Sequence, residues 1–463
     1  MTATTMPQST RYSPPTRPGI PFSAVRRQFE QGSLTPRAYL EQYIAVIESR
    51  EPVVRAFSAT NLAGARKAAD ESTARYKAGK PLSRIDGLPI GIKDLIETED
   101  MPTGMGSPIF TDWNSHRDAA CVEALRACGA VVVAKTVTTE FGVGASGPTT
   151  NPWDARRTPG GSSSGSAAAV GGGLLPTAIG TQVVGSIIRP SSFCGVFGYK
   201  TSHGAMNLGG IHSVVPSQAH LGAHALTLED VWVICRCIAD LAGGDPGHPQ
   251  LAGSVDLPAA LRPDALAVLR NPGWNEMEPG ARSAFDAYID LLAASGATLR
   301  TAKDTPAVAA IESVLADAMD VSGAICSYEM RWPVSGYRRR SPELIGTRTA
   351  GYLDQAAKMS NADYARTLAR RAEIKAAFVA FASEVDGCLL PSAVGPAPMG
   401  LESNGNRSYN ALSSGLGVPS FNLPFLSVDG LPLGVQYIGF PGGDEKAAAV
   451  CNWLTDGFFG RPA

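Results

Sequence analysis

The centre of the chain, residues 159–190, reads PGGSSSGSAAAVGGGLLPTAIGTQVVGSIIRP. Residues 167–188 of this stretch are nearly all apolar over 22 positions, which is the length of a membrane span. The glycines at 171–173, Pro176 and the polar Gln182 would leave a single lipid-exposed helix weak and partly polar. We therefore interpret the stretch as the buried centre of a soluble domain and predict no membrane segment.

The composition around this centre is that of a large globular chain. It has 463 residues, of which 44% are hydrophobic and 18% are charged, and its formal net charge is −2. This length allows one large or two medium domains with a buried core. The composition excludes a collagen, a coiled coil and an intrinsically disordered chain. A nucleic-acid partner is not expected, because such proteins usually have a basic excess.

The eight cysteines indicate a reducing compartment. They are too few for a disulfide scaffold in a chain of this size, and none of them forms a CxxC pair. The N-terminus, from Met1 to Pro21, lacks the basic-then-apolar pattern of a signal segment. We therefore predict a cytoplasmic location.

The order of predicted elements favours an α/β domain built around one sheet. Residues 1–20 are polar and Pro-rich, which is typical of a flexible arm. A helix is expected from Thr35, a capping residue followed by Pro36. Further expected elements are a helix over 61–79, a strand over 87–94, a helix and then a strand over 118–134, mostly helices over 255–385, strands at 387–390, 420–423 and 433–438, and a helix from 444.

The common catalytic and binding patterns do not explain the chain. Six histidines allow a Ser-His-Asp triad, but Ser186 lacks the flanking glycines of the G-x-S-x-G motif. His220 and His224 have the spacing of metal ligands on a helix, yet Gly222 lies between them and no Glu follows His220. The simpler interpretation is that these histidines lie on the surface or have their hydrogen bonds satisfied in the core. The Gly/Ser run at 160–166 lacks the G-K-[ST] ending of a phosphate-binding loop.

Three other pieces of sequence form a rarer pattern. Lys93 ends an apolar stretch; such a lysine most often extends its amine into water, but burial would lower its pKa and make it a base. The Ser-rich turn at 160–166 runs straight into Ala167, which is unusual for a flexible loop. The turn at 180–190 would expose Ser186 beside free backbone N–H groups, and a buried turn serine is the alternative.

Together these pieces resemble the amidase signature family. The family's run Pro-Gly-Gly-Ser-Ser-Gly-Gly is similar to Pro159–Ser166, and its nucleophile follows the first motif serine by 24 positions, as Ser186 follows Ser162. Similar segments also lie at 91–94, 151–154, 194–200 and 430–436. The resemblance covers roughly residues 22–455 and is weakest between 255 and 385.

The resemblance implies the architecture in more detail. We expect a single large α/β domain over 21–463, with a central twisted, mixed β-sheet covered by helices on both faces. Its signature core would occupy 90–205. The variable, mostly helical region at 255–385 would contribute to the substrate pocket.

The resemblance also implies the roles of individual residues. Ser186 would be the nucleophile, Ser162 the bridging serine that follows a cis peptide bond, and Lys93 the base. Neutral Lys93 would take a proton from Ser162 while Ser162 takes one from Ser186. No metal or cofactor is implied. The oxyanion hole is assigned to the backbone N–H groups of Val183, Val184, Gly185 and Ser186. The substrate-pocket candidates are Gly104, Met105, Phe141, Gly142, Gly161 and Ser163.

The chain departs from the family pattern just before the nucleophile. The commonest family sequence there is Thr-Asp-Thr-Gly-Gly-Ser-Ile-Arg. In this chain Gln182, Val183 and Val184 replace the Asp, the second Thr and the first Gly, and the arginine comes one place later, as Arg189. A β-branched residue at 184 would be strained if that position requires a positive φ.

These observations predict a serine amidohydrolase that acts on linear amides of small molecules. Aryl esters and carbamates (urethanes) are alternative substrates, because they too pass through an acyl- or carbamoyl-enzyme. Two other functions remain open: a glutaminyl-tRNA amidotransferase A-type subunit in a multi-subunit complex, and a catalytically dead binding homologue. A homodimer is a further open alternative.

Overall fold

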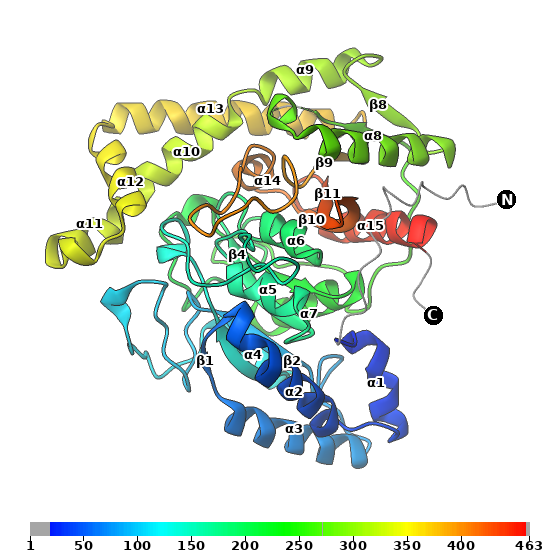
Figure 1. The fold of residues 1–463 in the computed structure, drawn as a ribbon. Helices are drawn as coiled ribbons and strands as arrows, with labels where there is room; N and C mark the ends of the chain where they lie inside the picture. The colour runs from blue at the N-terminus through cyan, green and yellow to red at the C-terminus, as the bar shows by residue number, and fades with distance from the viewer. Residues whose placement is uncertain (1–18, 271, 460–463) are drawn as a thin grey trace.

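A mixed β-sheet runs through the computed structural model, which describes residues 19–270 and 272–459 (Figure 1). Strand β2 is parallel to β3 and β4, and β7 is parallel to β8 and β9, whereas the other neighbours are antiparallel. The strands, in their order across the sheet, are β1 (Phe57–Thr60), β3 (Val131–Thr136), β2 (Pro89–Lys93), β4 (Thr177–Gln182), β6 (His220–Ala225), β5 (Phe197–Lys200), β10 (Ser420–Val428), β11 (Leu431–Ile438), β9 (Gly387–Pro391), β7 (Leu266–Val268) and β8 (Leu299–Thr301).

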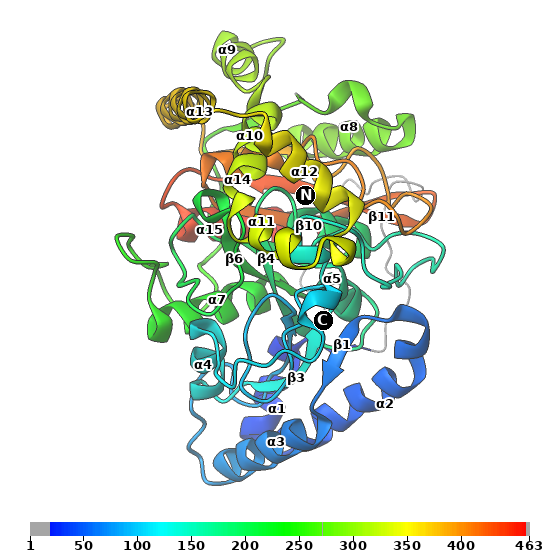
Figure 2. The same cartoon turned by 90° about the vertical axis from the view of Figure 1, so that its left-hand side faces the viewer.

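Helices flank the sheet, as predicted. Helices α2 and α3 lie at one end of the molecule and α9 and α13 at the other, in both views (Figures 1 and 2). The helices are α1 (Phe22–Gln31), α2 (Pro36–Val54), α3 (Leu62–Lys77), α4 (Ala120–Ala127), α5 (Ser164–Gly171), α6 (Ile188–Cys194), α7 (Leu228–Ala242), α8 (Pro279–Ala294), α9 (Pro306–Val314), α10 (Ala318–Glu329), α11 (Arg331–Arg340), α12 (Thr347–Ala357), α13 (Asn361–Phe381), α14 (Ala411–Leu416) and α15 (Asp444–Phe459).

Most of the predicted elements are confirmed, with small shifts at their ends. Thr35 caps α2 by accepting the N–H of Ala38. The predictions did not include α1, whose residues Phe22, Val25 and Phe29 are buried along one face. They also missed β5 and β6, which are short and contain glycine, so their alternation is weak. Residues 1–18 of the predicted N-terminal arm lie outside the described residues.

The apolar centre of the sequence forms a helix and a strand inside the domain. Helix α5 and strand β4 are buried along their whole lengths, as predicted for this stretch. Gly165 lets α5 approach its neighbours closely, because a Cβ at this position would lie 2.2 Å from the carbonyl oxygen of Ala56. Among the helices that the structure describes, none combines the length and apolarity needed to cross a bilayer.

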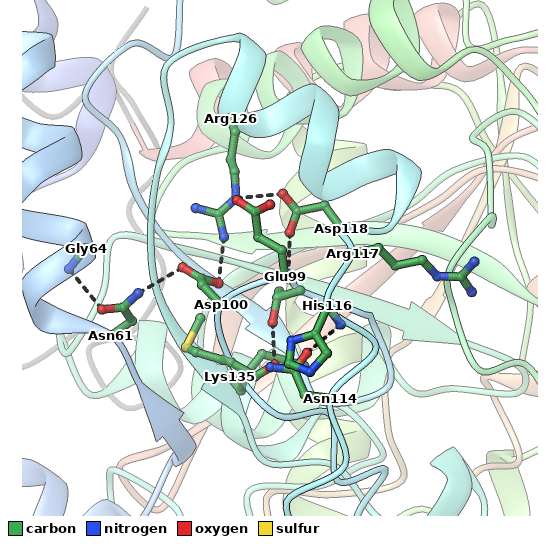
Figure 3. Close-up of polar contacts among 12 residues, drawn as sticks. Asn61, Gly64, Glu99, Asp100, Asn114, His116, Arg117, Asp118, Arg126 and Lys135 are labelled. Atoms are coloured by element: carbon green, nitrogen blue, oxygen red, sulfur yellow. Dashed lines mark hydrogen bonds and ion pairs between the residues drawn. The ribbon is translucent and has the colours of Figure 1, made fainter.

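Polar contacts fix the long connection between β2 and α4 (Figure 3). Arg126 on α4 donates to Asp118 from Nε over 2.8 Å and to Asp100 from Nη2 over 2.7 Å. Asp118 also accepts the backbone N–H of Glu99, and Asp100 accepts a hydrogen bond from the Asn61 side chain, both at 2.9 Å. Since Asn61 caps α3, the connection is held against both α3 and α4.

Candidate active site

Lys93 lies at the carboxyl end of β2, between the parallel strands β3 and β4. Its side chain is fully buried, and burial lowers the pKa of its amine well below the usual value. The Nζ atom lies 2.7 Å from Ser162 Oγ, 2.8 Å from Thr181 Oγ1 and 3.2 Å from the Thr181 carbonyl oxygen. Thr181 is within reach because the carboxyl ends of β2 and β4 lie side by side.

These three contacts match the hydrogen-bonding capacity of a neutral amine, which has two N–H donors and one lone pair. The Thr181 carbonyl can only accept, and the Thr181 hydroxyl oxygen can accept the second N–H. The lone pair is then left for the Ser162 hydroxyl proton. Asp94, the next residue, does not compensate a charge on Lys93, because its carboxylate lies 3.3 Å from Lys135 Nζ.

Ser162 lies in the turn that precedes α5, after a cis peptide bond with Gly161. Two hydrogen bonds fix this turn: Thr139 N donates to the Ser162 carbonyl over 3.2 Å, and Arg189 Nη2 donates to the Gly161 carbonyl over 2.6 Å. Gly160 has a φ of +80°, a conformation that glycine adopts without strain. The turn therefore holds the Ser162 hydroxyl against Lys93.

Ser186 lies between β4 and α6, in a turn that Gln182 organises. The Gln182 Oε1 atom accepts the N–H groups of Ile187 at 2.8 Å and Ile188 at 3.0 Å, while Nε2 donates to Ser414 Oγ. The Ser414 hydroxyl donates to the Val184 carbonyl over 2.9 Å. Gln182, which replaces the family's aspartate, thus bonds directly to two backbone N–H groups of the turn and, through Ser414, to the Val184 carbonyl.

The two serine turns are joined by their backbones. Ser163 N donates to the Ser186 carbonyl over 3.3 Å, and Ser163 Oγ donates to the Thr181 carbonyl over 3.2 Å. These bonds place Ser162 and Ser186 in the wall of one cavity. Within the described residues, the Ser186 hydroxyl has no hydrogen-bond partner, so its oxygen is free to meet a ligand.

The backbone before Ser186 presents free donors. In the described part of the chain, none of the N–H groups from Val183 to Ser186 donates to a protein acceptor. Val184 is not among the described non-glycine residues that have a positive φ, so the strain considered for a valine at this position does not arise. Four consecutive donors beside a hydroxyl can stabilise an oxyanion.

Two hollows meet at Ser162. We call the first the Ser186 cavity; its wall includes Ser162, Ser186, Val183, Val184, Arg189, Arg348, Tyr352, Asn404 and Arg407. We call the second the His212 cavity; its wall includes Leu95, Phe141, Thr181, His212, Val214 and His220. Gly142, Ser162 and Val183 belong to both walls. A substrate can therefore lie on either side of Ser162.

The predicted pocket residues are only partly brought together. Gly142 lines both cavities and Phe141 lines the His212 cavity. Met105 lines a wider groove further out, which also includes Phe110, Trp113, Tyr337 and Trp332 and which we call the aromatic groove. Among the described residues, the walls of these three hollows do not include Gly104, Gly161 or Ser163. Gly104 and Gly161 instead make backbone hydrogen bonds: Gly104 N donates to Asp94, and the Gly161 carbonyl accepts from Arg189.

The polar side chains opposite Ser186 were not predicted from the sequence. Arg348 and Tyr352 come from α12, while Asn404 and Arg407 come from the loop between β9 and α14. These residues are more than 150 positions away from Ser186 in the sequence, and no local motif marks them. Only the packing of α12 and this loop over the serine turns brings them into the site.

His220 and His224 lie on strand β6 instead of a helix. His220 Nδ1 lies 3.2 Å from the Gln182 carbonyl, and His224 Nδ1 lies 2.8 Å from Ser191 Oγ. Burial lowers the pKa of both imidazoles. Over the residues that the structure describes, no group of three or more His, Cys, Asp or Glu side chains has the arrangement of metal ligands.

Comparison with known proteins identifies the family of the chain and proteins of similar sequence and fold. The family model described as Amidase matches residues 38–447. The chain is 33% identical to the A-type subunit of the glutamyl-tRNA(Gln) amidotransferase of Chloroflexus aggregans, over 91% of this chain and 93% of that protein. It is 32% identical to the corresponding protein of Roseiflexus sp. (strain RS-1), over 91% and 92%. A crystal structure of an amidase superimposes with a TM-score of 0.82 at 28% identity, over 94% of this chain and 99% of that one.

Proposed function

The chain belongs to the amidase family, and from this premise we propose that it hydrolyses linear amides through an acyl-enzyme on Ser186. The observation that carries the proposal is the distance of 2.7 Å between Lys93 Nζ and Ser162 Oγ at a site closed to solvent. A serine hydroxyl is a weak nucleophile and needs a nearby base. A buried, uncharged lysine supplies that base at neutral pH.

The proposed reaction uses the serines as a relay. Ser186 Oγ attacks the amide carbonyl carbon while its proton passes to Ser162, whose own proton passes to Lys93. The relay then returns a proton to the departing amine, and the C–N bond breaks to leave the acyl group on Ser186. Water attacks this ester by the same route, so that one amide and one water give one carboxylic acid and one amine.

The free N–H groups from Val183 to Ser186 are proposed to hold the oxyanion. Each such donor contributes about 3 kcal/mol of transition-state stabilisation when it is preorganised. Among the described residues Ser186 makes no side-chain hydrogen bond to Ser162, and catalytic hydrogen bonds of this kind often tighten only in the complex with substrate. Aryl esters and carbamates would react by the same steps, because they present the same carbonyl to Ser186.

A serine-directed fluorophosphonate probe tests the nucleophile. The wild type should be labelled at Ser186 and the Ser186→Ala variant should not. Ser164→Ala is a matched control, because this serine belongs to the same motif but donates to the Val137 carbonyl. Failure to label the wild type, together with no turnover of a panel of anilides, aliphatic amides, aryl esters and carbamates, would instead support a catalytically dead binding homologue.

A second candidate function comes from the curated relatives. Those of Chloroflexus aggregans and Roseiflexus are A-type subunits of a glutamyl-tRNA(Gln) amidotransferase, and the chain aligns with more than nine-tenths of each. If this chain had that role, it would work with partner subunits. Affinity purification of the chain from its native cells decides between the two: stoichiometric partner subunits would favour the amidotransferase, and a chain that is active when purified alone favours the hydrolase.

We also propose a cytoplasmic location. All eight cysteines are free thiols, and each of them is buried. Unpaired cysteines in this number fit a reducing compartment. Activity in the cytosolic fraction of lysed cells, separated from membranes and periplasm, tests the proposal.

A further inference from the structure

Three arginines line the Ser186 cavity, and among the described residues no aspartate or glutamate lines it. Arg189 is buried, Arg407 is half-buried and Arg348 is exposed, so positive charge extends from beside the nucleophile to the cavity mouth. On the neighbouring helix α11, Arg338 forms an ion pair with Asp354, whereas Arg331 and Arg340 lie over the rings of Tyr328 and Tyr337. In the described part of the chain, none of the three cavity arginines has such an ion pair.

The hydrogen-bonding capacity of Arg189 is only partly used. Its Nη2 donates to the Gly161 carbonyl, but Nε and Nη1 are buried without a partner. Burial lowers the pKa of Arg189 to about 9, and the nearby charges of Arg407 and Arg348 act in the same direction. Burying a cation without a counter-charge destabilises the folded protein, and buried N–H donors of a native protein normally have a hydrogen-bond acceptor.

The neighbouring polar groups do not neutralise this charge. Arg407 Nη1 donates to the Tyr352 hydroxyl over 3.0 Å, and a phenol oxygen is uncharged. The carboxylate of Glu140 is occupied by the backbone N–H of Gly346 and by the Thr349 hydroxyl. Glu276 accepts hydrogen bonds from Asn406 and Ser408, on either side of Arg407, but forms no ion pair with Arg407 itself. Among the described residues no carboxylate is paired with the three cavity arginines, and an anionic ligand in the cavity would supply that partner.

We infer that the preferred substrates are amides whose acyl group ends in a carboxylate, which Arg348 and Arg407 bind together with the Tyr352 hydroxyl. Guanidinium groups recognise carboxylates with short, charge-assisted hydrogen bonds. The acyl side is assigned to this cavity because Ser186, which would carry the acyl group, lines it and is not among the described residues that line the His212 cavity. The His212 cavity shares Ile211, His212 and Ser213 with the aromatic groove, which gives the leaving group a way out. The inference rests on the proposed amide hydrolysis.

Matched 4-nitroanilides test the charge preference. In the succinic monoamide the acyl chain ends in a carboxylate, and in the 4-methylpentanoic amide an isopropyl group of similar shape replaces it. We expect kcat/KM for the succinyl compound to be at least tenfold higher. N-Butyryl-4-aminobenzoate, which has its carboxylate on the leaving group, should gain nothing over butyranilide. Equal rates for the first pair, or a preference for the aminobenzoate, would overturn the inference.

Single substitutions test which arginines cause the preference for the succinyl substrate. Arg348→Met and Arg407→Met should each lower kcat/KM at least tenfold for the succinyl substrate and less than threefold for its neutral partner, and Arg407→Lys should recover part of the loss. Arg339→Met is the matched control, because this arginine is exposed on α11 and lies outside the wall of the Ser186 cavity. A preference that survives in both methionine variants would show that these arginines do not bind the carboxylate.

Binding to the Ser186→Ala variant separates this inference from the proposed function. Calorimetry should detect the succinyl anilide and not the neutral one, and Arg407→Met should abolish the signal while thermal unfolding shows that the variant is folded. If the carboxylate binds but the wild type hydrolyses no amide, the proposed function fails and the anion site stands. If neutral amides are cleaved as fast as charged ones, the function stands and the anion site fails.

Discussion

Lys93 Nζ contacts Ser162 Oγ on one side and both oxygens of Thr181 on the other, and the amine is closed to solvent. Two of these three oxygens can take the N–H donors of an uncharged amine, which leaves its lone pair for the serine. Burial disfavours the charged form of this lysine in the folded state only. In the proposed mechanism Lys93 is the base, so the same proton would affect both the reaction rate and the free energy of unfolding.

The first prediction concerns the pH dependence of stability. The pKa of Lys93 is lowered on folding, so between the folded pKa and about 10.5 the unfolded chain binds one proton more than the folded chain. The free energy of unfolding must then rise with pH, by up to about 1.4 kcal/mol per pH unit from this group. In Lys93→Met this contribution is absent. The wild type should therefore gain stability relative to the variant between pH 8 and 10.

Denaturant unfolding of both proteins at several pH values measures this difference, and other titrating groups cancel because the two proteins share them. Lys67→Met serves as the control, since this lysine is exposed and should show no such trend. A constant difference in the free energy of unfolding between wild type and Lys93→Met across this range would mean that Lys93 keeps its proton on folding. Lys93 could then not be the proposed base.

The second prediction concerns the pH dependence of the rate. Because Lys93 must be uncharged to accept the Ser162 proton, kcat/KM should rise tenfold per pH unit below its folded pKa and level off above it. The plateau should begin well below pH 10.5, because burial lowers the pKa. Lys93→Met should lose at least 10²-fold in activity, and its residual rate should lack this rise. An optimum near pH 5 in the wild type would contradict the role of Lys93.

The parts of the site that could be predicted are those with local motifs. Lys93, Ser162 and Ser186 each belong to a short, specific run, and the sheet and its two tight turns bring all three together. The strand at 87–94 was also recognisable, because its apolar alternation is regular. Sequence was informative here because the backbone conformation and the chemistry depend on the same few residues.

The rest of the site depends on long-range packing. Arg348 and Arg407 look like any other arginines in the sequence, and only the docking of α12 and the loop before α14 makes them neighbours of Ser186. Gly104, Gly161 and Ser163 were predicted to line the pocket but are not among the described residues in the walls of the three hollows. Each is adjacent in sequence to a residue that lines a hollow, and sequence proximity does not fix which residues reach the surface of a cavity.

The third prediction concerns Gln182, which holds the turn that carries Ser186, the proposed nucleophile. Gln182→Leu would leave the N–H groups of Ile187 and Ile188 without an acceptor, and we expect a loss of about 2–4 kcal/mol in stability and at least tenfold in kcat. Gln182→Glu keeps the acceptor but not the donor to Ser414, so it should fall between the wild type and Gln182→Leu. Denaturant unfolding and steady-state kinetics provide the two readouts. Equal kcat values in all three proteins would show that the turn does not depend on this side chain.

The fourth prediction concerns Val184, where the family more often has glycine. The backbone at 184 does not have a positive φ, so glycine should bring no relief of strain and kcat should change less than threefold in Val184→Gly. Stability should instead fall by about 2–3 kcal/mol, because the valine side chain is buried in an apolar cluster with Met105 and Phe141 and because glycine gains backbone freedom in the unfolded chain. Val184→Ala is the matched control, with a smaller loss of stability and no added freedom. A kcat that rises tenfold or more in Val184→Gly, but not in Val184→Ala, would show that the valine restricts the N–H donors, and the oxyanion hole would then have to be rebuilt around a different backbone conformation.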